Sequence, residues 1–191
     1  MHRFVVALLL TAAATIGITA VVSAETARSV AQYSFVVANA PKDALSSDGR
    51  MRVRVMRWST DDERRQLMAA LEEPAKLLNA LPYVDGVVGY LKWPGGLEHS
   101  VRYARQTTRS DGGADIVMVV ERPLWLWWDP AARWSADHQF TVVQIRLNKD
   151  GRGEGRIATG DGFTRDSNSG VVISDTAKPA LLTDVRRESV K

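Results

Sequence analysis

Residues 97–121 read LEHSVRYARQTTRSDGGADIVMVVE, a stretch whose pattern predicts two of the strands around which the fold is built. The side chains of its first half alternate, which predicts a β-strand with Val101, Tyr103 and Arg105 on one face. The sequence SDGG at 110–113 is rich in turn formers and predicts a reversal of the chain. The IVMVV run that follows is typical of a buried strand. The stretch therefore predicts two antiparallel strands joined by a turn.

Similar runs of β-branched and aromatic residues occur on both sides of this stretch. We expect further strands at 33–40, 50–58, 87–93, 124–128, 140–148, 154–159, 171–175 and 180–188. In the second of these, Met51, Val53 and Val55 alternate with arginines, which predicts one buried and one solvated face. Residues 160–170 are the most loop-like part of the chain after its N-terminal segment.

One segment changes from a period of two to helical spacing. Thr60 and Glu63 in the sequence TDDE are spaced as in a capping box, which marks the start of a helix. Apolar residues continue at helical spacing to about residue 81. Because Pro74 fits poorly inside a single helix, we expect the helical segment at about 60–81 to break there and a second short helix to begin.

These patterns together predict an α+β fold that is predominantly antiparallel β. We expect a curled meander, either a partly open barrel or a two-layer sheet, with one broken helical segment covering one end. Residues 25–191 are expected to form a single β-rich domain, since no internal repeat or low-complexity linker divides them.

The first 24 residues have the pattern of a signal peptide. A short basic start precedes the uncharged stretch 4–22, and small side chains at Val22 to Ala24 favour cleavage after Ala24. We therefore expect an exported protein, either periplasmic or secreted. The alternative is that residues 4–22 remain as an anchor in the inner membrane, because the stretch is nearly long enough to span a bilayer.

Composition narrows the class of protein further. The chain has no cysteine, which excludes thiol catalysis, disulfides and an N-terminal lipid on cysteine. The 25 basic and 22 acidic side chains make a mixed surface, so we expect no nucleic-acid partner. No glycine-rich phosphate loop or metal-binding motif is present, and we expect no cofactor.

Several local sequences occur in an order that resembles a known group of proteins. They are RWSTDDE, GYLKWPGG, VRYARQT, IVMVVERP, FTVVQIRLNKDGRGEG and LLTDVRR. The chain resembles an uncharacterised family of exported bacterial proteins with no assigned activity. The resemblance implies an exported β-rich domain and transfers no catalytic residues.

The most unusual local feature is a cluster of tryptophans. Trp125, Trp127 and Trp128 lie in one expected strand, and Trp134 follows just beyond it. These rings either fill the core or form the aromatic wall of a ligand-binding surface. In the second interpretation Arg133 helps to orient the ligand.

Arg50, Arg52 and Arg54 form an arginine ladder on the solvated face of one expected strand. The planar guanidinium fork binds carboxylate or phosphate, so the ladder is a candidate anion-binding site. The alternative is a solvated strand face whose charges prevent pairing between strand edges.

Few residues in the sequence form a pattern that is typical of an enzyme active site. After cleavage only His99 and His138 remain, and neither belongs to a metalloprotease motif. We therefore expect a non-catalytic envelope protein, with no catalytic or metal-binding residue assigned. Its partner would be a small amphiphile, another envelope component or a protein, bound through the aromatic strand region. The alternative is a carboxylate- or metal-dependent hydrolase built near the two histidines.

Overall fold

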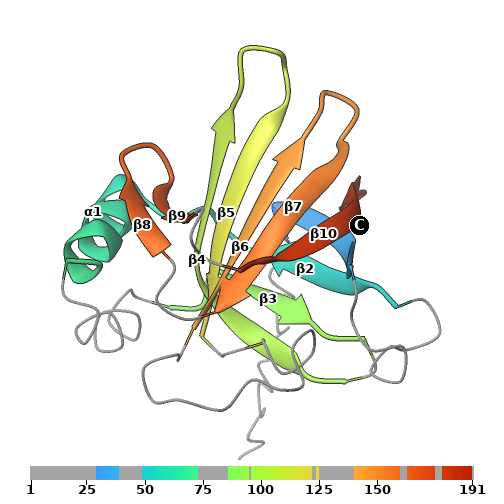
Figure 1. The fold of residues 1–191 in the computed structure, drawn as a ribbon, viewed down its shortest axis with the longest axis horizontal. Coiled ribbons are helices and arrows are strands. Elements are labelled where there is room, and N and C mark those ends of the chain that lie inside the picture. The colour runs from blue at the N-terminus through green and yellow to red at the C-terminus, as the bar shows by residue number, and fades with distance from the viewer. Residues whose placement is uncertain are drawn as a thin grey trace, which may run out of the picture.

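The computed structural model describes residues 29–38, 49–72, 86–94, 96–121, 124, 140–159, 163–174 and 178–190. Within them, ten strands and one helix follow one another along the chain (Figure 1). Their bounds are β1 (Ala31–Val37), β2 (Met51–Val55), α1 (Asp61–Ala70), β3 (Gly89–Lys92), β4 (Glu98–Thr108), β5 (Ala114–Val120), β6 (Thr141–Leu147), β7 (Arg152–Thr159), β8 (Phe163–Asp166), β9 (Gly170–Ile173) and β10 (Ala180–Glu188).

Eight of these strands close into one antiparallel barrel, in the order β1-β10-β7-β6-β5-β4-β3-β2. β10 completes the circle, because it pairs with β7 on one side and with β1 on the other. β8 and β9 pair only with each other, in a hairpin inserted between β7 and β10. The predicted fold class is confirmed, and the curled meander is a closed barrel.

The interior of the barrel is filled with apolar side chains, as the width of an eight-stranded barrel allows. The largest fully buried members of this cluster are Tyr33, Phe35, Met51, Leu91, Ile116, Met118, Leu124, Ile157 and Leu182. Burying each such side chain contributes about 1.5–3 kcal/mol. The alternation predicted for 50–58 is confirmed, since Met51, Val53 and Val55 all lie in this core.

The alternation predicted for β4 is wrong at one point. The register between β4 and β5 shifts between Val101 and Tyr103, so Arg102 is an extra residue in β4. Val101 and Ala104 therefore both point into the barrel core, whereas Tyr103 lies in a second cluster outside it. Such bulges accommodate the curvature of a closing sheet, a requirement that an isolated strand sequence does not reveal.

Two glycines let β7 approach β6 closely. A Cβ atom on Gly153 would lie 1.8 Å from the carbonyl oxygen of Arg146, and one on Gly155 would lie 2.3 Å from that of Gln144. A side chain at either position would collide with the neighbouring backbone. These glycines therefore permit the close strand packing that the small barrel needs.

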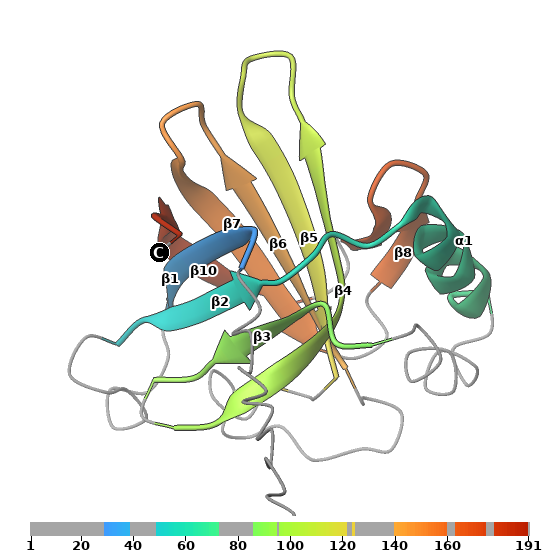
Figure 2. The ribbon, with the colours of Figure 1, turned by 180° about the vertical axis from the view of Figure 1, so that it is seen from behind.

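α1 and the β8–β9 hairpin lie side by side against one side of the barrel (Figure 2). They enclose a second apolar cluster with the outer face of β4 to β7. Its buried members are Leu67, Ala70, Tyr103, Val117, Val119, Phe140, Val142, Ala158, Val171 and Ile173. The loop predicted for 160–170 is wrong in part, because β8 lies within it. The sequence shows no strand pattern there, since β8 has only four, mostly polar, residues.

α1 begins as predicted. Thr60 accepts a hydrogen bond from the Glu63 N–H, and the Glu63 carboxylate accepts one from the Thr60 N–H. The predicted break at Pro74 and the second short helix lie outside the described residues, as does the predicted signal peptide at 1–24. The helical residues that the structure does describe include no span with the length and hydropathy that a bilayer crossing needs.

Candidate functional site

The outward side chains of β4 to β7 form three cross-strand rows, because the register places them opposite one another. The first row is apolar and consists of Tyr103, Val119, Val142 and Ala158. The second is mixed and consists of Arg105, Val117, Gln144 and Arg156. The third is polar or charged and consists of Thr107, Asp115, Arg146 and Glu154. Polarity therefore increases steadily along this face.

A groove of about 880 Å³ lies where the hairpin stops covering this face. Most of the second and third rows form its floor, together with Leu181 and Thr183 of β10. The hairpin forms its wall with residues that include Asp166, Ser169 and Ile173. The groove thus has an apolar side, next to the first row, which the hairpin covers, and a charged side away from the hairpin.

Side chains hold β9 against the barrel beside the groove. Gln144 Oε1 accepts a hydrogen bond from the Ile173 N–H at 3.0 Å and another from Arg156 Nη2 at 3.2 Å. The same Arg156 nitrogen donates to the Ile173 carbonyl at 3.4 Å. These two side chains therefore bind both main-chain polar groups of Ile173.

Tyr103 fixes the other end of the hairpin. Its hydroxyl donates to the Ser169 carbonyl at 2.7 Å, and burial raises the pKa of Tyr103 to about 12. Gly170, with φ of 91°, packs so closely that a Cβ atom there would lie 2.8 Å from the Tyr103 hydroxyl. Residue 170 therefore requires glycine for both its backbone angle and its contact.

The Asp166 carboxylate orders the turn between β8 and β9. It accepts hydrogen bonds from the N–H groups of Asn168 and Ser169, at 3.1 and 2.7 Å, and from Ser169 Oγ at 2.7 Å. Burial alone would raise the pKa of Asp166, but these hydrogen bonds together lower it below its ordinary value. These hydrogen bonds therefore define the turn that forms part of the groove wall.

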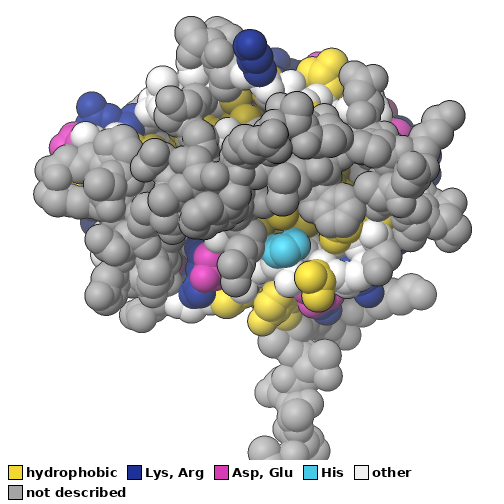
Figure 3. Space-filling model, turned by 60° about the horizontal axis from the view of Figure 1, so that its bottom comes forward, with side chains coloured by type: hydrophobic (Ala, Val, Ile, Leu, Met, Phe, Trp, Pro, Cys, Tyr) yellow, Lys and Arg dark blue, Asp and Glu magenta, His cyan; other side chains and the backbone are white. Residues whose placement is uncertain are grey.

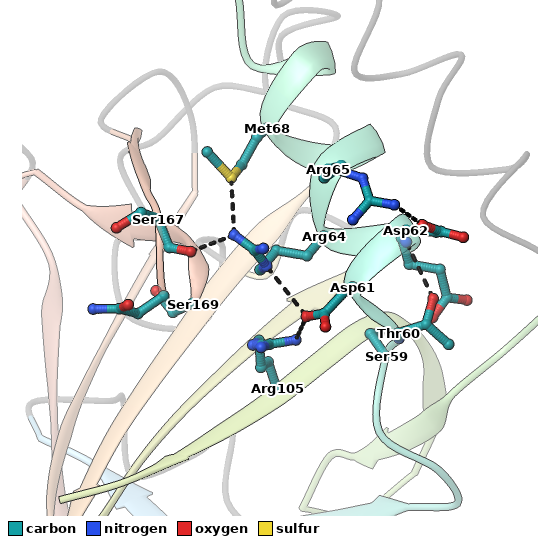
Figure 4. A network of polar contacts seen from close by, with 12 residues as sticks. Ser59, Thr60, Asp61, Asp62, Arg64, Arg65, Met68, Arg105, Ser167 and Ser169 are labelled. Atoms are coloured by element: carbon teal, nitrogen blue, oxygen red, sulfur yellow. Dashed lines mark hydrogen bonds and ion pairs between the residues drawn. The ribbon is translucent and has the colours of Figure 1, made fainter.

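A network of charged groups joins α1 to the barrel and the hairpin (Figure 4). Asp61 binds Arg105 of β4 at 2.9 Å and lies 3.6 Å from Arg64 Nε. Arg64 also donates to the Ser167 carbonyl in the turn of the hairpin. The hydrogen bond from Arg105 is the main reason that the pKa of Asp61 is lowered. Helix, hairpin and β4 are thereby tied together at one end of the groove wall.

The charged floor of the groove carries both signs. Arg146 binds Asp115 at 3.1 Å, and Glu154 lies directly opposite Arg146 on the neighbouring strand. Leu181, which is 56% exposed, extends the second row next to Arg156. The lining therefore offers hydrogen-bond donors, acceptors and an exposed apolar side chain within one groove.

The aromatic site predicted at Trp125, Trp127, Trp128, Arg133 and Trp134 lies outside the described residues. It stays a prediction. The groove residues were not identified from the sequence, because their alternation along β5, β6 and β7 resembles that of any solvated strand face.

The predicted arginine ladder lies on the outside of the barrel, as expected for its strand. Arg50 binds Asp184 at 2.5 Å, and Arg54 binds both carboxylate oxygens of Glu98 at 3.0 Å. Arg52 lies between them on β2, opposite Lys92 of β3. Arg50 and Arg54 thus form ion pairs with acidic side chains of other strands.

The hydrolase hypothesis requires His99 and His138 to lie close together. The structure does not test this, because His138 lies outside the described residues. His99 lies on β4 opposite Leu91 of β3. A histidine side chain lies among hydrophobic ones on the end of the molecule that Figure 3 shows. Within the described ranges, no group of three His, Asp or Glu side chains is arranged to hold a metal ion.

Comparison with known proteins identifies no relative. No protein-family model matches the chain, and no curated protein and no solved structure shows significant similarity to it. The resemblance to exported bacterial proteins therefore stays a prediction, and function has to be argued from the site itself.

Proposed function

We propose that this chain is a non-catalytic binding protein whose groove holds an extended segment of a partner protein. The observation that carries the proposal is the groove itself, with its gradient from apolar to charged lining across β5, β6 and β7. Its volume of about 880 Å³ lies in the range of specific binding sites. The partner class is one of those that the sequence suggests, bound here on a different surface.

The lining suits a polypeptide better than a purely apolar ligand. Threonine, serine, asparagine and glutamine side chains alternate with Val172, Ile173 and Leu181 around the groove. An extended peptide presents main-chain donors and acceptors between side chains that point to opposite sides. Its polar backbone can therefore bind the hydroxyl and amide groups, while one apolar side chain packs on Leu181.

The charges of the floor set a preference for the partner. Arg146 favours an acidic side chain in the segment, and Glu154 favours a basic one beside it. Because both groups are exposed, each new ion pair adds only about 0.2–1 kcal/mol. The charges therefore set the register of the segment more than its affinity.

A selection from a library of displayed random peptides on the intact protein tests the proposal. We expect peptides with adjacent acidic and basic residues and one apolar residue. Their affinity should fall at least tenfold for Leu181→Asp. The double variant Arg146→Glu with Glu154→Arg keeps the net charge and should bind the selected peptide more weakly. Exchanging the two charges in the peptide should restore its affinity for this variant.

Arg65→Glu, on the exposed face of α1, is the matched control and should leave peptide affinity unchanged. The proposal fails if the selected peptides bind the Leu181→Asp protein as well as the original one. It also fails if charge exchange in the peptide restores nothing, because the charges of the groove would then make no contact with it.

A further inference from the structure

The groove runs across the strands, from β10 at one end to β4 at the other. Its second row takes one residue from each of these five adjacent strands, in the order Leu181, Arg156, Gln144, Val117 and Arg105. Neighbouring strands are about 4.8 Å apart, so the row is about 19 Å long. Because an extended chain rises about 3.3 Å per residue, a segment of about six residues spans the row.

The first turn of α1 stands at the β4 end of the groove. Its Asp61 binds Arg105 of β4 at 2.9 Å, and Arg64 donates to the Ser167 carbonyl in the turn of the hairpin (Figure 4). Val117, directly opposite Arg105, and Asn168, next to Ser167, both line the groove. A segment that runs along the groove toward β4 therefore meets α1, where its chain has to end or turn away.

Two guanidinium groups at this end share one carboxylate. Among the residues that the structure describes, Asp61 is the only ion-pair partner of Arg64 and of Arg105. The Nε atoms of both arginines are buried and have no hydrogen-bond partner there. The Asp166 carboxylate of the nearby turn accepts its three hydrogen bonds from within that turn. The two arginines therefore keep hydrogen-bonding capacity for a second carboxylate.

Both arginines are accessible from outside the protein. The side chain of Arg64 is 19% exposed and that of Arg105 is 26% exposed. Asp61 contacts Nη1 of Arg105, so a second carboxylate can bind the other side of this guanidinium without displacing Asp61. Thr107, two residues beyond Arg105 in β4, lines the groove. The free side of the guanidinium can therefore be reached by a segment that lies in the groove.

A free C-terminus fits this end of the groove better than other groups of a polypeptide. The two cations select an anion, which excludes an N-terminal ammonium. An acidic side chain within a longer segment would require the chain to continue where α1 stands. We infer that the groove binds the C-terminal end of the partner, with its terminal carboxylate held by Arg64 and Arg105. This inference rests on the proposed function and adds a direction to it.

The direction sets the positions of the other preferred side chains. Arg146 on β6 lies two strands from β4, which corresponds to about three residues before the terminus. Glu154 on β7 lies one strand farther, which corresponds to about four residues. Leu181 lies at about six residues. We therefore expect an acidic residue, then a basic one and then an apolar one, counted back from the carboxylate.

Peptides selected from a random library that is displayed with free C-termini test this inference. Each is synthesised with a free C-terminal carboxylate, with a C-terminal amide, and with two extra residues, Gly-Ser, at its C-terminus. Calorimetric titration of the full chain should show that the free form binds at least tenfold more tightly than either other form. The reason is that only its carboxylate reaches the two arginines at the end of the groove.

Arg105→Gln should reduce this preference for the free form to threefold or less. A purely structural role of Arg105 would weaken the three forms equally and leave the preference unchanged. Arg105→Lys keeps a charge for Asp61 but loses the planar fork, so its preference should be intermediate. Arg109→Gln is the matched control, because it removes an arginine and an ion pair with Asp111 from the same strand region and should keep the full preference.

The outcomes separate this inference from the proposed function. Equal binding of the three forms to the unaltered protein would overturn the inference, even where Leu181→Asp still weakens all of them. A lost preference in the Arg109→Gln protein would also overturn it, since the general charge of β4 would then attract the carboxylate. Selected peptides whose affinity does not depend on Leu181 would overturn the proposed function itself.

Discussion

At Asp184 the backbone of β10 has φ of 48°, in the left-handed region that most residues avoid. The register of β10 shifts here against both β1 and β7. The Asp184 carboxylate binds Arg186 at 2.8 Å and Arg50 at 2.5 Å. The hydrogen bonds from these arginines, Arg186 first, lower the pKa of Asp184. One residue thus combines an unusual backbone angle with contacts across the strands that close the barrel.

Substitutions at Asp184 should separate these two roles. Asn adopts the left-handed region readily, so Asp184→Asn loses only the charge of exposed ion pairs and should lower the thermal midpoint slightly. Asp184→Val adds backbone strain and should lower it clearly more. Calorimetry of both proteins makes the comparison, and equal midpoints would show that the backbone angle does not matter.

Removing the hydroxyl of Tyr103 should loosen the hairpin. Tyr103→Phe leaves the buried Ser169 carbonyl without this donor and should cost about 1–3 kcal/mol in the free energy of unfolding. Tyr33→Phe is the matched control, because the Tyr33 hydroxyl makes one longer bond, 3.2 Å to Gln106. Urea denaturation should show the larger loss for Tyr103→Phe, and the reverse order would contradict this assignment.

Glu63 should make stability depend on pH in the acidic range. Its pKa is lowered below 4.5, first by the hydrogen bond from Arg57 and then by its capping bonds. A lowered folded-state pKa means that this stabilisation is complete above the unfolded pKa and is lost as pH falls through the folded value. Glu63→Gln should therefore be less stable at pH 7, and the difference should disappear as pH falls through the lowered pKa of Glu63. A constant difference at all pH values would contradict the assignment.

At the scale of elements, the hairpin is the part of the fold on which the groove depends. It is joined to the barrel by side chains, and its position depends on Gln144, Arg156 and Tyr103. The outer face of β4 to β7 would otherwise expose its apolar row to water. The hairpin therefore both covers a hydrophobic surface and creates the wall of the proposed binding site.

Gln144→Leu should release β9 locally. The Ile173 N–H would lose its acceptor, which should lower the free energy of local opening by about 1.4 kcal/mol. The hydrogen exchange of this N–H should therefore become at least tenfold faster. Gln144→Glu keeps an acceptor for both Ile173 and Arg156 and should retain the protection. Unchanged exchange in the Leu variant would show that the hairpin is held by its apolar contacts alone.

Sequence patterns predicted most of the strands because their alternation reflects one buried face. The strand expected at 180–188 coincides with β10, and the capping box at Thr60 begins α1. They did not predict β8, which is short and polar, or the extra residue Arg102, which depends on barrel curvature. They did not identify the groove, because it exists only where the hairpin, β10 and the barrel meet.

At the scale of the whole molecule, closure links all of these features. In the closed barrel each of the eight strands pairs with a neighbour on both sides along at least part of its length. The inside of the barrel is filled by side chains, which leaves its outer faces for binding. The outer face of β5, β6, β7 and β10 bears the groove.

Closure also depends on close packing of β6 and β7. Gly153→Ala would place a methyl group against the Arg146 carbonyl and should destabilise the fold by at least about 1–3 kcal/mol. Gly96→Ala is the matched control, since no atom lies within 4 Å of its Cβ position. Denaturant unfolding should separate the two proteins, and similar stabilities would contradict the tight contact between these strands.

Amide chemical-shift mapping by NMR, with a selected peptide titrated into the full chain, tests the proposed function most directly. We predict that shift changes gather on β5, β6, β7, β9 and β10 around the groove and leave β2 and β3 unchanged. Peptide-induced changes that avoid β6 and β9 would contradict the proposal that the groove is the binding site.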